Sequence, residues 1–367
     1  MNAPLPKTKG DAAIVDFKLS SSNQLPISKF DIGEVASFIA RIQRSDGEIP
    51  WAAGQKSDPW DHIESAMGLS VGGYQQEARR AFRWLAERQL EDGSWYTAYR
   101  QGIAEDKTRD ANLSSYIAVG LFHHFLITKD VALLEQMWPT IFKAINFALS
   151  LQTPNGEIYW AISPKGNIDR MALLTGSSSI YMSIKCALAI AKILGLPVPS
   201  WESACIKLAD AIKNKPYLFN MTKSRFSMDW FYPILAGIIT GLDAQKRIDR
   251  YWKKFVVEDR GVRCVSDKPW VTIAETAELT LALAGMGNLE LARIVFNWIS
   301  DRRYEDGSYW CGFICPDLIT WPEDKITWTN AVALVAADAI YNLTPANVLF
   351  SHHFWATSAV SPFADRS

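Results

Sequence analysis

The sequence lacks the charge pattern and the loop that mark most proteins of nucleic acids and nucleotides. Its 38 Lys and Arg nearly balance its 39 Asp and Glu, which leaves a formal net charge of -1. The basic residues are scattered, so there is no electrostatic footprint for DNA or RNA. No glycine-rich loop of the phosphate-cradling type is present. We therefore expect neither a nucleic acid nor a nucleotide as partner.

Features of exported and membrane proteins are also sparse. The five cysteines show no paired framework, which favours a reducing compartment. The first residues, MNAPLPKTKGDAAIVDF, contain no apolar signal segment, and the most apolar stretch, 180–198, is interrupted by Lys185 and Lys192. The apolar tail favours packing on its own domain over membrane contact. We predict a cytoplasmic protein, with peripheral contact to a membrane as the alternative.

Aromatic residues, by contrast, are abundant, and many of them recur in one phrase. The phrase is an aromatic residue, then Gln or Arg, Asp or Asn, Gly and Trp. Its four copies are Phe38-Gln43-Asp46-Gly47-Trp51, Trp84-Gln89-Asp92-Gly93-Trp95, Phe147-Gln152-Asn155-Gly156-Trp160 and Trp298-Arg303-Asp306-Gly307-Trp310. Such a repeat indicates one supersecondary unit copied around a closed or stacked fold.

The segments on either side of each repeat turn differ in character. Those before it, such as EARRAFRWLAERQ, are amphipathic, whereas those after it, such as ETAELTLALAGMG, are apolar almost all round. Strict alternation of six such outer and six inner helices predicts an all-α fold, a single (α/α)6 barrel. We assign residues 1–30 to an N-terminal extension, 31–345 to the barrel and 346–367 to a C-terminal tail.

The barrel prediction also locates a site. All inner helices would begin at one end, so the residues at their starts should rim a common cavity, the default binding site. These residues are Asp58, Trp60, Asp61, Arg109, Asp110, Asn112, Asp229, Trp230, Tyr232, Trp270, Glu275, Trp328 and Asn330.

The repeat WLAERQLEDGSW resembles the QW repeat of squalene-hopene and oxidosqualene cyclases. A single-barrel chain is similar to the monodomain class II terpene cyclases of the merosterolic acid synthase type. This resemblance, over residues 31–345, implies a metal-independent isomerase that protonates and cyclises a polyprenyl chain. The implied substrate is a small isoprenoid or prenylated aromatic, such as a geranylgeranylated or farnesylated dihydroxybenzoate in meroterpenoid biosynthesis, and no cofactor is implied.

The resemblance places the catalytic acid in the segment TRDANLSS, where Asp110 would be the proton donor and Asn112 or His62 would orient it. Burial would raise the pKa of Asp110, while the helix N-terminus would favour its anion. The alternative is that Thr108 caps the helix and that Asp110 only stabilises the helix through its charge at the positive end of the dipole.

Aromatic rings at the inner-helix starts would hold the migrating cation. We assign Trp60, Trp230, Tyr232, Trp270 and Trp328 to substrate binding, since a ring face attracts a cation by about 0.5–2 kcal/mol. Trp51, Trp95, Trp160 and Trp310 belong to the repeat turns and are predicted to staple outer helices.

Asp58 and Asp61 are rival acids. Asp58 also fits a helix N-cap followed by Pro, and Asp61 and His62 are included among the substrate-binding residues. No metal-ligand set and no DDxxD cluster are found, so we predict no metal.

A different enzyme class also fits an aromatic α/α barrel. A glycoside hydrolase or lyase would use two carboxylates about 5 to 9.5 Å apart, here Asp61 or Asp110 with Glu275. A third possibility, a non-catalytic isoprenoid carrier, would keep the cavity and not need Asp110.

Overall fold

A computed structural model describes residues 31–362, so the predicted extension 1–30 lies outside the described residues. The outer helices are α1 (Ile32–Ile42), α3 (Gln75–Arg88), α6 (Val131–Ser150), α8 (Pro199–Asn214), α10 (Gly241–Phe255) and α12 (Leu289–Asn297). The inner helices are α2 (Pro59–Val71), α4 (Ala111–Ser115) continued by α5 (Ile117–Thr128), α7 (Leu174–Leu194), α9 (Met228–Leu235), α11 (Ile273–Gly285) and α13 (Thr327–Tyr341).

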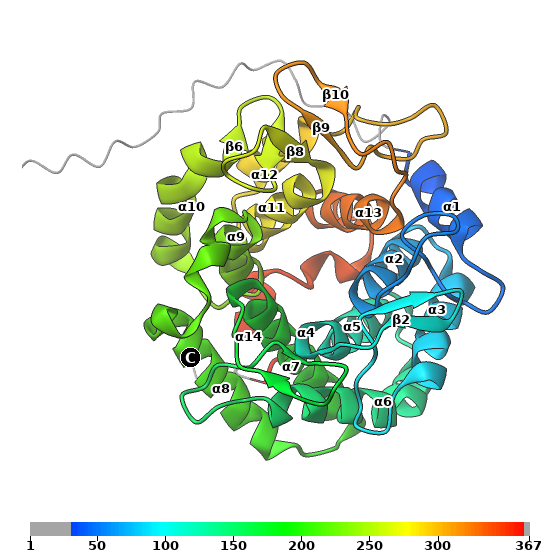
Figure 1. Cartoon of the computed structure of the whole chain (residues 1–367), viewed down its shortest axis with the longest axis vertical. Helices are drawn as coiled ribbons and strands as arrows, with labels where there is room; N and C mark the ends of the chain where they lie inside the picture. The colour runs from blue at the N-terminus through cyan, green and yellow to red at the C-terminus, as the bar shows by residue number, and fades with distance from the viewer. Residues whose placement is uncertain (1–30, 363–367) are drawn as a thin grey trace, which may run out of the picture.

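The inner helices form a closed ring. In order, α2, α5, α7, α9, α11 and α13 each contact the next, and α13 returns to α2. Figure 1 looks down the barrel and shows the outer helices surrounding this ring. The all-α, single (α/α)6 barrel predicted from the sequence is therefore confirmed.

The two rings differ in burial as their sequences predict. In the outer helix α10, the buried residues are Ala244, Ile248, Trp252 and Phe255, a stripe along one face. In the inner helix α11, by contrast, every residue from Ile273 to Leu283 is buried. The inner helix α7 is long and apolar enough to cross a membrane, but 83% of that segment is buried inside the barrel.

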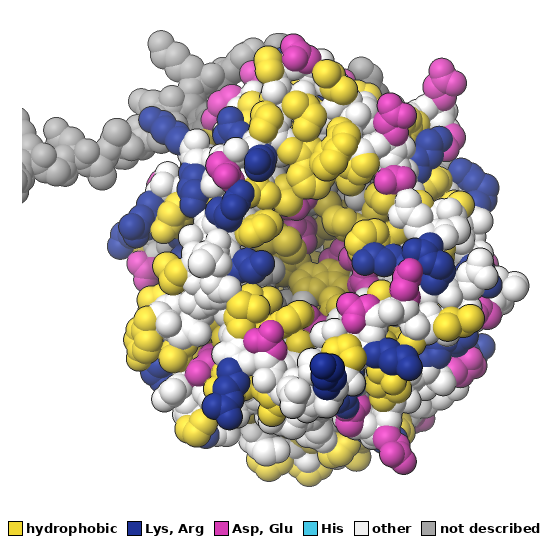
Figure 2. All heavy atoms as spheres, viewed as in Figure 1, with side chains coloured by type: hydrophobic (Ala, Val, Ile, Leu, Met, Phe, Trp, Pro, Cys, Tyr) yellow, Lys and Arg dark blue, Asp and Glu magenta, His cyan; other side chains and the backbone are white. Residues whose placement is uncertain are grey.

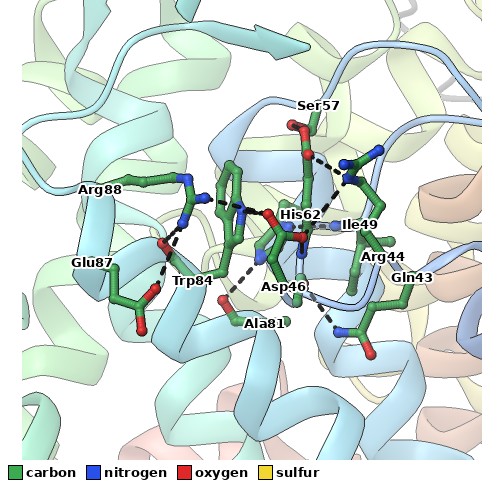
Figure 3. Close-up of polar contacts among 12 residues, drawn as sticks. Gln43, Arg44, Asp46, Ile49, Ser57, His62, Ala81, Trp84, Glu87 and Arg88 are labelled. Atoms are coloured by element: carbon green, nitrogen blue, oxygen red, sulfur yellow. Dashed lines mark hydrogen bonds and ion pairs between the residues drawn. The ribbon is translucent and has the colours of Figure 1, made fainter. Parts of the chain in front are cut away.

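The repeat turns join the outer helices to one another by the same pair of hydrogen bonds. Gln89 donates from Nε2 to the carbonyl of Gly93 in its own turn, at 3.0 Å, and to that of Thr140 in the next outer helix, at 2.9 Å. Gln43 and Gln152 make equivalent pairs of bonds. Figure 3 shows the first of these turns, where Asp46 also contacts Arg88 and Trp84. The repeat thus encodes the hydrogen bonds that join neighbouring outer helices.

The loops at the start of the inner helices contain short antiparallel strands that the sequence analysis treated as loops. One sheet has the order β10-β9-β8-β7-β6, a second β3-β4-β5 and a third β1-β2. Their bounds are β1 Ala98–Arg100, β2 Ile103–Asp106, β3 Arg109–Asp110, β4 Ala161–Ile162, β5 Ile168–Asp169, β6 Val256–Val257, β7 Gly261–Arg263, β8 Trp270–Thr272, β9 Gly312–Ile314 and β10 Ile319–Thr320. β3 leads directly into α4 and β8 into α11, so the sheets fix how these inner helices begin.

The C-terminal segment closes the other end of the barrel. After η4 (Pro345–Val348), α14 (His352–Thr357) places Trp355 against Phe122, with a ring separation of 5.6 Å. His352 bonds to the carbonyl of Ile234 at the end of α9, and the Lys185 ammonium lies 4.4 Å from the Trp355 ring. In Figure 1 this segment passes behind the ring of inner helices. The described tail packs on its own barrel, which leaves the opposite end as the mouth.

The turn glycines provide a test of how closely each repeat turn packs against the next outer helix. Gly93 has φ +92°, and a Cβ added there would lie 2.2 Å from the carbonyl oxygen of Lys143 in α6. We expect Gly93→Ala to lower the free energy of unfolding by about 2–4 kcal/mol, measured by urea denaturation. Gly166→Ala is the control, because Gly166 has φ +85° but nothing within 4 Å. Equal losses in the two variants would show that backbone strain, not the close approach, explains the effect.

Candidate active site

The mouth of the barrel is ringed by carboxyl groups. Figure 2 shows a hollow at the centre of this face, lined by hydrophobic side chains with acidic side chains inside it. The acidic residues in the first two turns of the inner helices, or capping them, are Asp58, Asp61, Glu64, Asp110, Asp229, Glu275 and Glu278. All are buried except Asp61 and Asp110, which are partly exposed.

Asp58 and Asp61 form a coupled pair at the start of α2. Asp58 is the N-cap, as the sequence predicted: its Oδ1 accepts from the Asp61 backbone at 3.0 Å and its Oδ2 from the Trp51 indole at 2.7 Å. Burial, followed by the neighbouring charges of Asp58 and Glu64, raises the pKa of Asp61 well above its usual range.

One helical turn deeper, Glu64 on α2 and Glu278 on α11 are both buried, and each accepts a hydrogen bond from a tyrosine. Tyr116 donates to Glu64 at 3.1 Å, and Tyr232 donates to Glu278 at 2.6 Å. Burial raises the pKa of Glu64 to about 7. The pKa of Glu278 is also raised, first by burial and then by the charges of Glu64 and Glu275.

Besides burial, the charge of Glu64 on α2 raises the pKa of Glu278 on α11, which indicates that the two side chains are near each other. Residues three apart lie on the same side of a helix, so Asp61 stands one turn above Glu64, and Glu275 one turn above Glu278. The charge of Glu64 acts on Glu278, so we infer that Asp61 and Glu275, one turn nearer the helix starts, face the same space. The two helices thus present two tiers of carboxyl groups, an upper tier of Asp61 and Glu275 and a lower tier of Glu64 and Glu278.

Trp60 lies among the lower-tier groups. Its ring stacks on Tyr116, with centroids 4.7 Å apart, and lies 5.9 Å from the ring of Tyr232. The indole also hydrogen-bonds to Glu64. Of the predicted substrate-binding aromatics, Trp60 and Tyr232 are therefore the two that the structure brings together beside acidic groups.

Asp110 and Asn112 lie beside a separate cavity of about 250 Å³ between the starts of α4, α7 and α9. Asp110 itself caps α4, because its Oδ1 accepts from the backbones of Asn112 at 2.7 Å and Leu113 at 3.0 Å. The cap is thus Asp110 and not Thr108. Burial outweighs these bonds and raises the pKa of Asp110 to about 6, so that the group is mostly ionised at neutral pH.

Two predicted substrate-binding residues are instead occupied in packing. His62 is fully buried, and Figure 3 shows its Nδ1 facing the backbone N–H of Ile49, at 3.0 Å, and its Nε2 facing the carbonyl of Ala81, at 2.9 Å. Both nitrogens are used, so His62 cannot orient Asp110. Trp230 is 2% exposed, stacks on Phe255 and donates to the carbonyl of Arg247.

The remaining two predicted aromatics lie at the rim. Trp270, on β8, donates to the carbonyl of Trp321 at 2.9 Å, and the two rings lie 5.1 Å apart. Trp321 is 53% exposed. Trp328, in the first turn of α13, is partly buried, and its indole nitrogen has no hydrogen-bond partner among the described residues.

The sequence analysis missed Glu64, Glu278 and Trp160. The signal for the two acids was present, since a carboxylate inside a helix that is apolar all round has to be buried. Trp160 was assigned to a repeat turn, yet it lines the cavity beside Asp110. Within residues 31–362, no group of three or more His, Cys, Asp and Glu side chains is arranged to hold a metal ion.

The comparisons with known proteins identify the family. No protein-family model matches the chain. It is 48% identical over 317 residues to an MMP endo-(1,4)-3-O-methyl-alpha-D-mannosidase of Mycolicibacterium hassiacum, a match that covers 86% of this chain and 88% of the relative. The chain belongs to this mannosidase family.

Solved structures support the fold of this mannosidase family member. A GH63 mannosylglycerate hydrolase from Thermus thermophilus, in complex with glucose, superposes with a TM-score of 0.65 at 11% identity. The match covers 84% of this chain and 99% of the hydrolase. A glycosidase variant in complex with glucose gives a TM-score of 0.65 at 16% identity, covering 88% of this chain and 100% of the glycosidase.

The family assignment overturns the terpene cyclase interpretation. The chain is not a class II cyclase or isomerase, and an isoprenoid or prenylated aromatic is not its substrate. The physical reason is visible at the mouth. A cyclase cavity holds a hydrocarbon chain, whereas this mouth is ringed by buried and partly buried carboxyl groups that suit a polar substrate. The repeat indicates a barrel architecture and does not indicate terpene cyclisation.

The lower tier makes a prediction about pH and stability. The folded state raises the pKa of Glu64 from 4.5 to about 7. Between these values the folded chain binds more protons than the unfolded chain, so its stability should fall as pH rises through this window. Glu64→Gln removes that loss, while its amide oxygen can still accept from Tyr116.

We therefore expect Glu64→Gln to gain stability relative to the unmodified protein between about pH 4.5 and pH 7, by chemical denaturation at both pH values. Glu87→Gln is the control, because the Glu87 side chain is 70% exposed on α3. A difference in unfolding free energy that is the same at both pH values would contradict the raised pKa.

Proposed function

We propose that the protein is a glycoside hydrolase that cleaves α-(1→4) bonds within a mannose oligosaccharide carrying 3-O-methyl groups. The observation that carries this proposal is the 48% identity to an endo-mannosidase of that name, and Asp61 and Glu275 in the first turns of α2 and α11 are the carboxyl pair that we assign to it. Glycosidases commonly use two carboxyl groups that flank the scissile bond. The second interpretation of the sequence, with Asp61 and Glu275 as the pair, is the one that we adopt.

Asp61 is the general acid in this proposal. The leaving sugar oxygen must be protonated as its bond to the anomeric carbon breaks. A proton donor needs a pKa held above that of an exposed carboxyl, as burial and two acidic neighbours provide for Asp61. Its partial exposure leaves it within reach of a substrate in the mouth.

Glu275 is the second carboxylate, which acts on the anomeric carbon or on the attacking water. It lies in the first turn of α11, where the helix N-terminus favours a negative charge. The strand β8 and the sheet around it fix the backbone immediately before this turn. The developing positive charge on the sugar ring would thus meet an anion on one side and a proton donor on the other.

The lower tier positions these groups. Glu64 adds negative charge beneath Asp61, which contributes to its raised pKa. Trp60, stacked on Tyr116, offers an apolar surface of the kind that supports the C–H face of a sugar. Glu64 and Glu278 are each oriented by a tyrosine hydroxyl, so neither carboxyl is free to rotate.

Loss of either upper-tier carboxyl should abolish hydrolysis. We expect Asp61→Asn and Glu275→Gln each to lower kcat/KM by about 10²–10⁴-fold on an α-(1→4)-linked 3-O-methylmannose oligosaccharide, with products measured by chromatography. Asp243→Asn is the control, since Asp243 is 79% exposed on the outer helix α10. Full activity in either upper-tier variant would remove that residue from the mechanism.

The two roles can be separated with an activated leaving group. A fluoride or nitrophenolate needs no proton, so such a glycoside should restore turnover to Asp61→Asn but not to Glu275→Gln. The alkaline limb of the pH profile should also flatten in Asp61→Asn, because the raised pKa of Asp61 sets it. Rescue of Glu275→Gln alone would exchange the two assignments.

A further inference from the structure

The cavity between α4, α7 and α9 is not used by the proposed acid pair. Its polar lining comes from first turns or caps of these helices, including Asp110, Asn112, Thr175 and Asp229. The charge of Asp58 acts on Asp110, so the cavity belongs to the same mouth as the Asp58–Asp61 pair. Its volume of about 250 Å³ is slightly below the roughly 300–1,000 Å³ of pockets for drug-sized ligands. It therefore suits one sugar ring better than a chain.

Several polar groups of the lining have no partner in the protein. The Oδ1 of Asn112, the indole nitrogen of Trp160 and the Oγ of Ser177 are buried without a hydrogen bond among the described residues. All three side chains line the cavity. Buried polar groups are nearly always paired in native proteins, so three that are unpaired around one cavity indicate a ligand with both donors and acceptors.

The backbone of Trp160 is fixed, although its indole is unpaired. Its N–H donates to the carbonyl of Met171, at 2.9 Å, and its carbonyl accepts from Ala111, at 2.8 Å. Opposite, Thr175 donates through both its backbone and its hydroxyl to one oxygen of Asp229. The polar side of the cavity is thus preorganised, and a second Asp229 oxygen is not used by these bonds.

Apart from Lys223 and Gly176, the rest of the lining is apolar. It consists of Ile158, Leu173, Ile180, Phe226 and Met228. A sugar with all its hydroxyls free would place some of them against these side chains without partners, at a cost in desolvation. An O-methyl group removes one donor and adds a methyl that suits an apolar wall.

We propose that this cavity is a subsite for one O-methylated mannose unit and that it selects methylated over unmethylated substrate. The inference rests on the proposed function, because the mannose chain must cross the mouth to reach both the cavity and the upper-tier acids. Burying one methyl group contributes about 0.8 kcal/mol, which corresponds to about a fourfold preference for the methylated sugar.

Gly176 allows the cavity to be filled without disturbing the fold. A Cβ added there would lie 3.6 Å from the Cβ of Asn112 and 3.8 Å from that of Leu173, both ordinary contacts. Gly176→Leu should occupy the space of the sugar, whereas Gly176→Ala should have a smaller effect. Gly33→Leu on the exposed side of α1 is the matched control, since its added Cβ meets only Asp31, at 3.3 Å.

The test has a binding arm and a kinetic arm, both with the full chain. In saturation-transfer NMR, methyl 3-O-methyl-α-D-mannopyranoside should bind about fourfold more tightly than methyl α-D-mannopyranoside, with its methoxy protons most strongly saturated. Gly176→Leu should lose this signal, and Gly33→Leu should keep it. With the methylated oligosaccharide, Gly176→Leu should raise KM at least about tenfold while kcat changes little.

Trp160→Phe checks the polar side independently. It removes the unpaired N–H, so binding of the methylated glycoside should weaken about two- to tenfold, without a loss of thermal stability. Unchanged binding in both Trp160→Phe and Gly176→Leu, in a protein that still hydrolyses the oligosaccharide, would overturn the subsite and leave the proposed function intact. Binding that depends on Gly176 without any hydrolysis would support the subsite and refute the proposed function. Equal binding of the methylated and unmethylated glycosides would overturn the proposed selectivity.

Discussion

The packing of the outer helices around this mouth depends on one recurring hydrogen-bond arrangement, which is made by a glutamine side-chain amide in three of the repeat turns. In three turns a glutamine Nε2 bonds to its own turn and to the next outer helix, each time at 2.9 Å for the longer-range bond. Each such bond contributes only about 0.5–1.5 kcal/mol. Its position matters more, because it fixes where the following chain enters the barrel. The alternation of outer and inner helices makes every inner helix begin at the same end, so the residues of their first turns meet at one mouth.

That constraint concentrates negative charge. The first two turns and the caps of four inner helices carry seven carboxyl groups, and five of them are buried. Burial and mutual repulsion both oppose ionisation, so such a site is stable only if some groups stay protonated. The hydroxyls of Tyr116 and Tyr232 offset part of this cost by bonding to the lower-tier acids. Burying these acidic groups lowers the stability of the fold, but a carboxyl group that keeps its proton at neutral pH is what acid catalysis requires.

The sequence was sufficient for the fold, but not for the arrangement of side chains at the mouth. The repeat and the alternation of amphipathic and apolar segments determine a closed barrel, and Asp58 followed by Pro is readable as an N-cap. Position along the chain was a poor guide to aromatic roles. Trp230 begins an inner helix yet points into packing with Phe255, whereas Trp160 belongs to a repeat turn yet lines a cavity. The direction of a side chain depends on neighbours distant in sequence, which no local pattern records.

The resemblance to terpene cyclases failed because the repeat and the chemistry belong to different parts of the chain. The glutamine and glycine of each turn are selected by the close approach of two outer helices, a requirement that is independent of any substrate. Function depends on a few side chains at the inner-helix starts, and one fold can host many such sets. Glu64 and Glu278 separate the two cases here, because acidic groups buried under a cavity have no partner to bind on a hydrocarbon chain. They are well suited to a sugar, whose hydroxyls and ring can use acceptors, donors and an aromatic surface together.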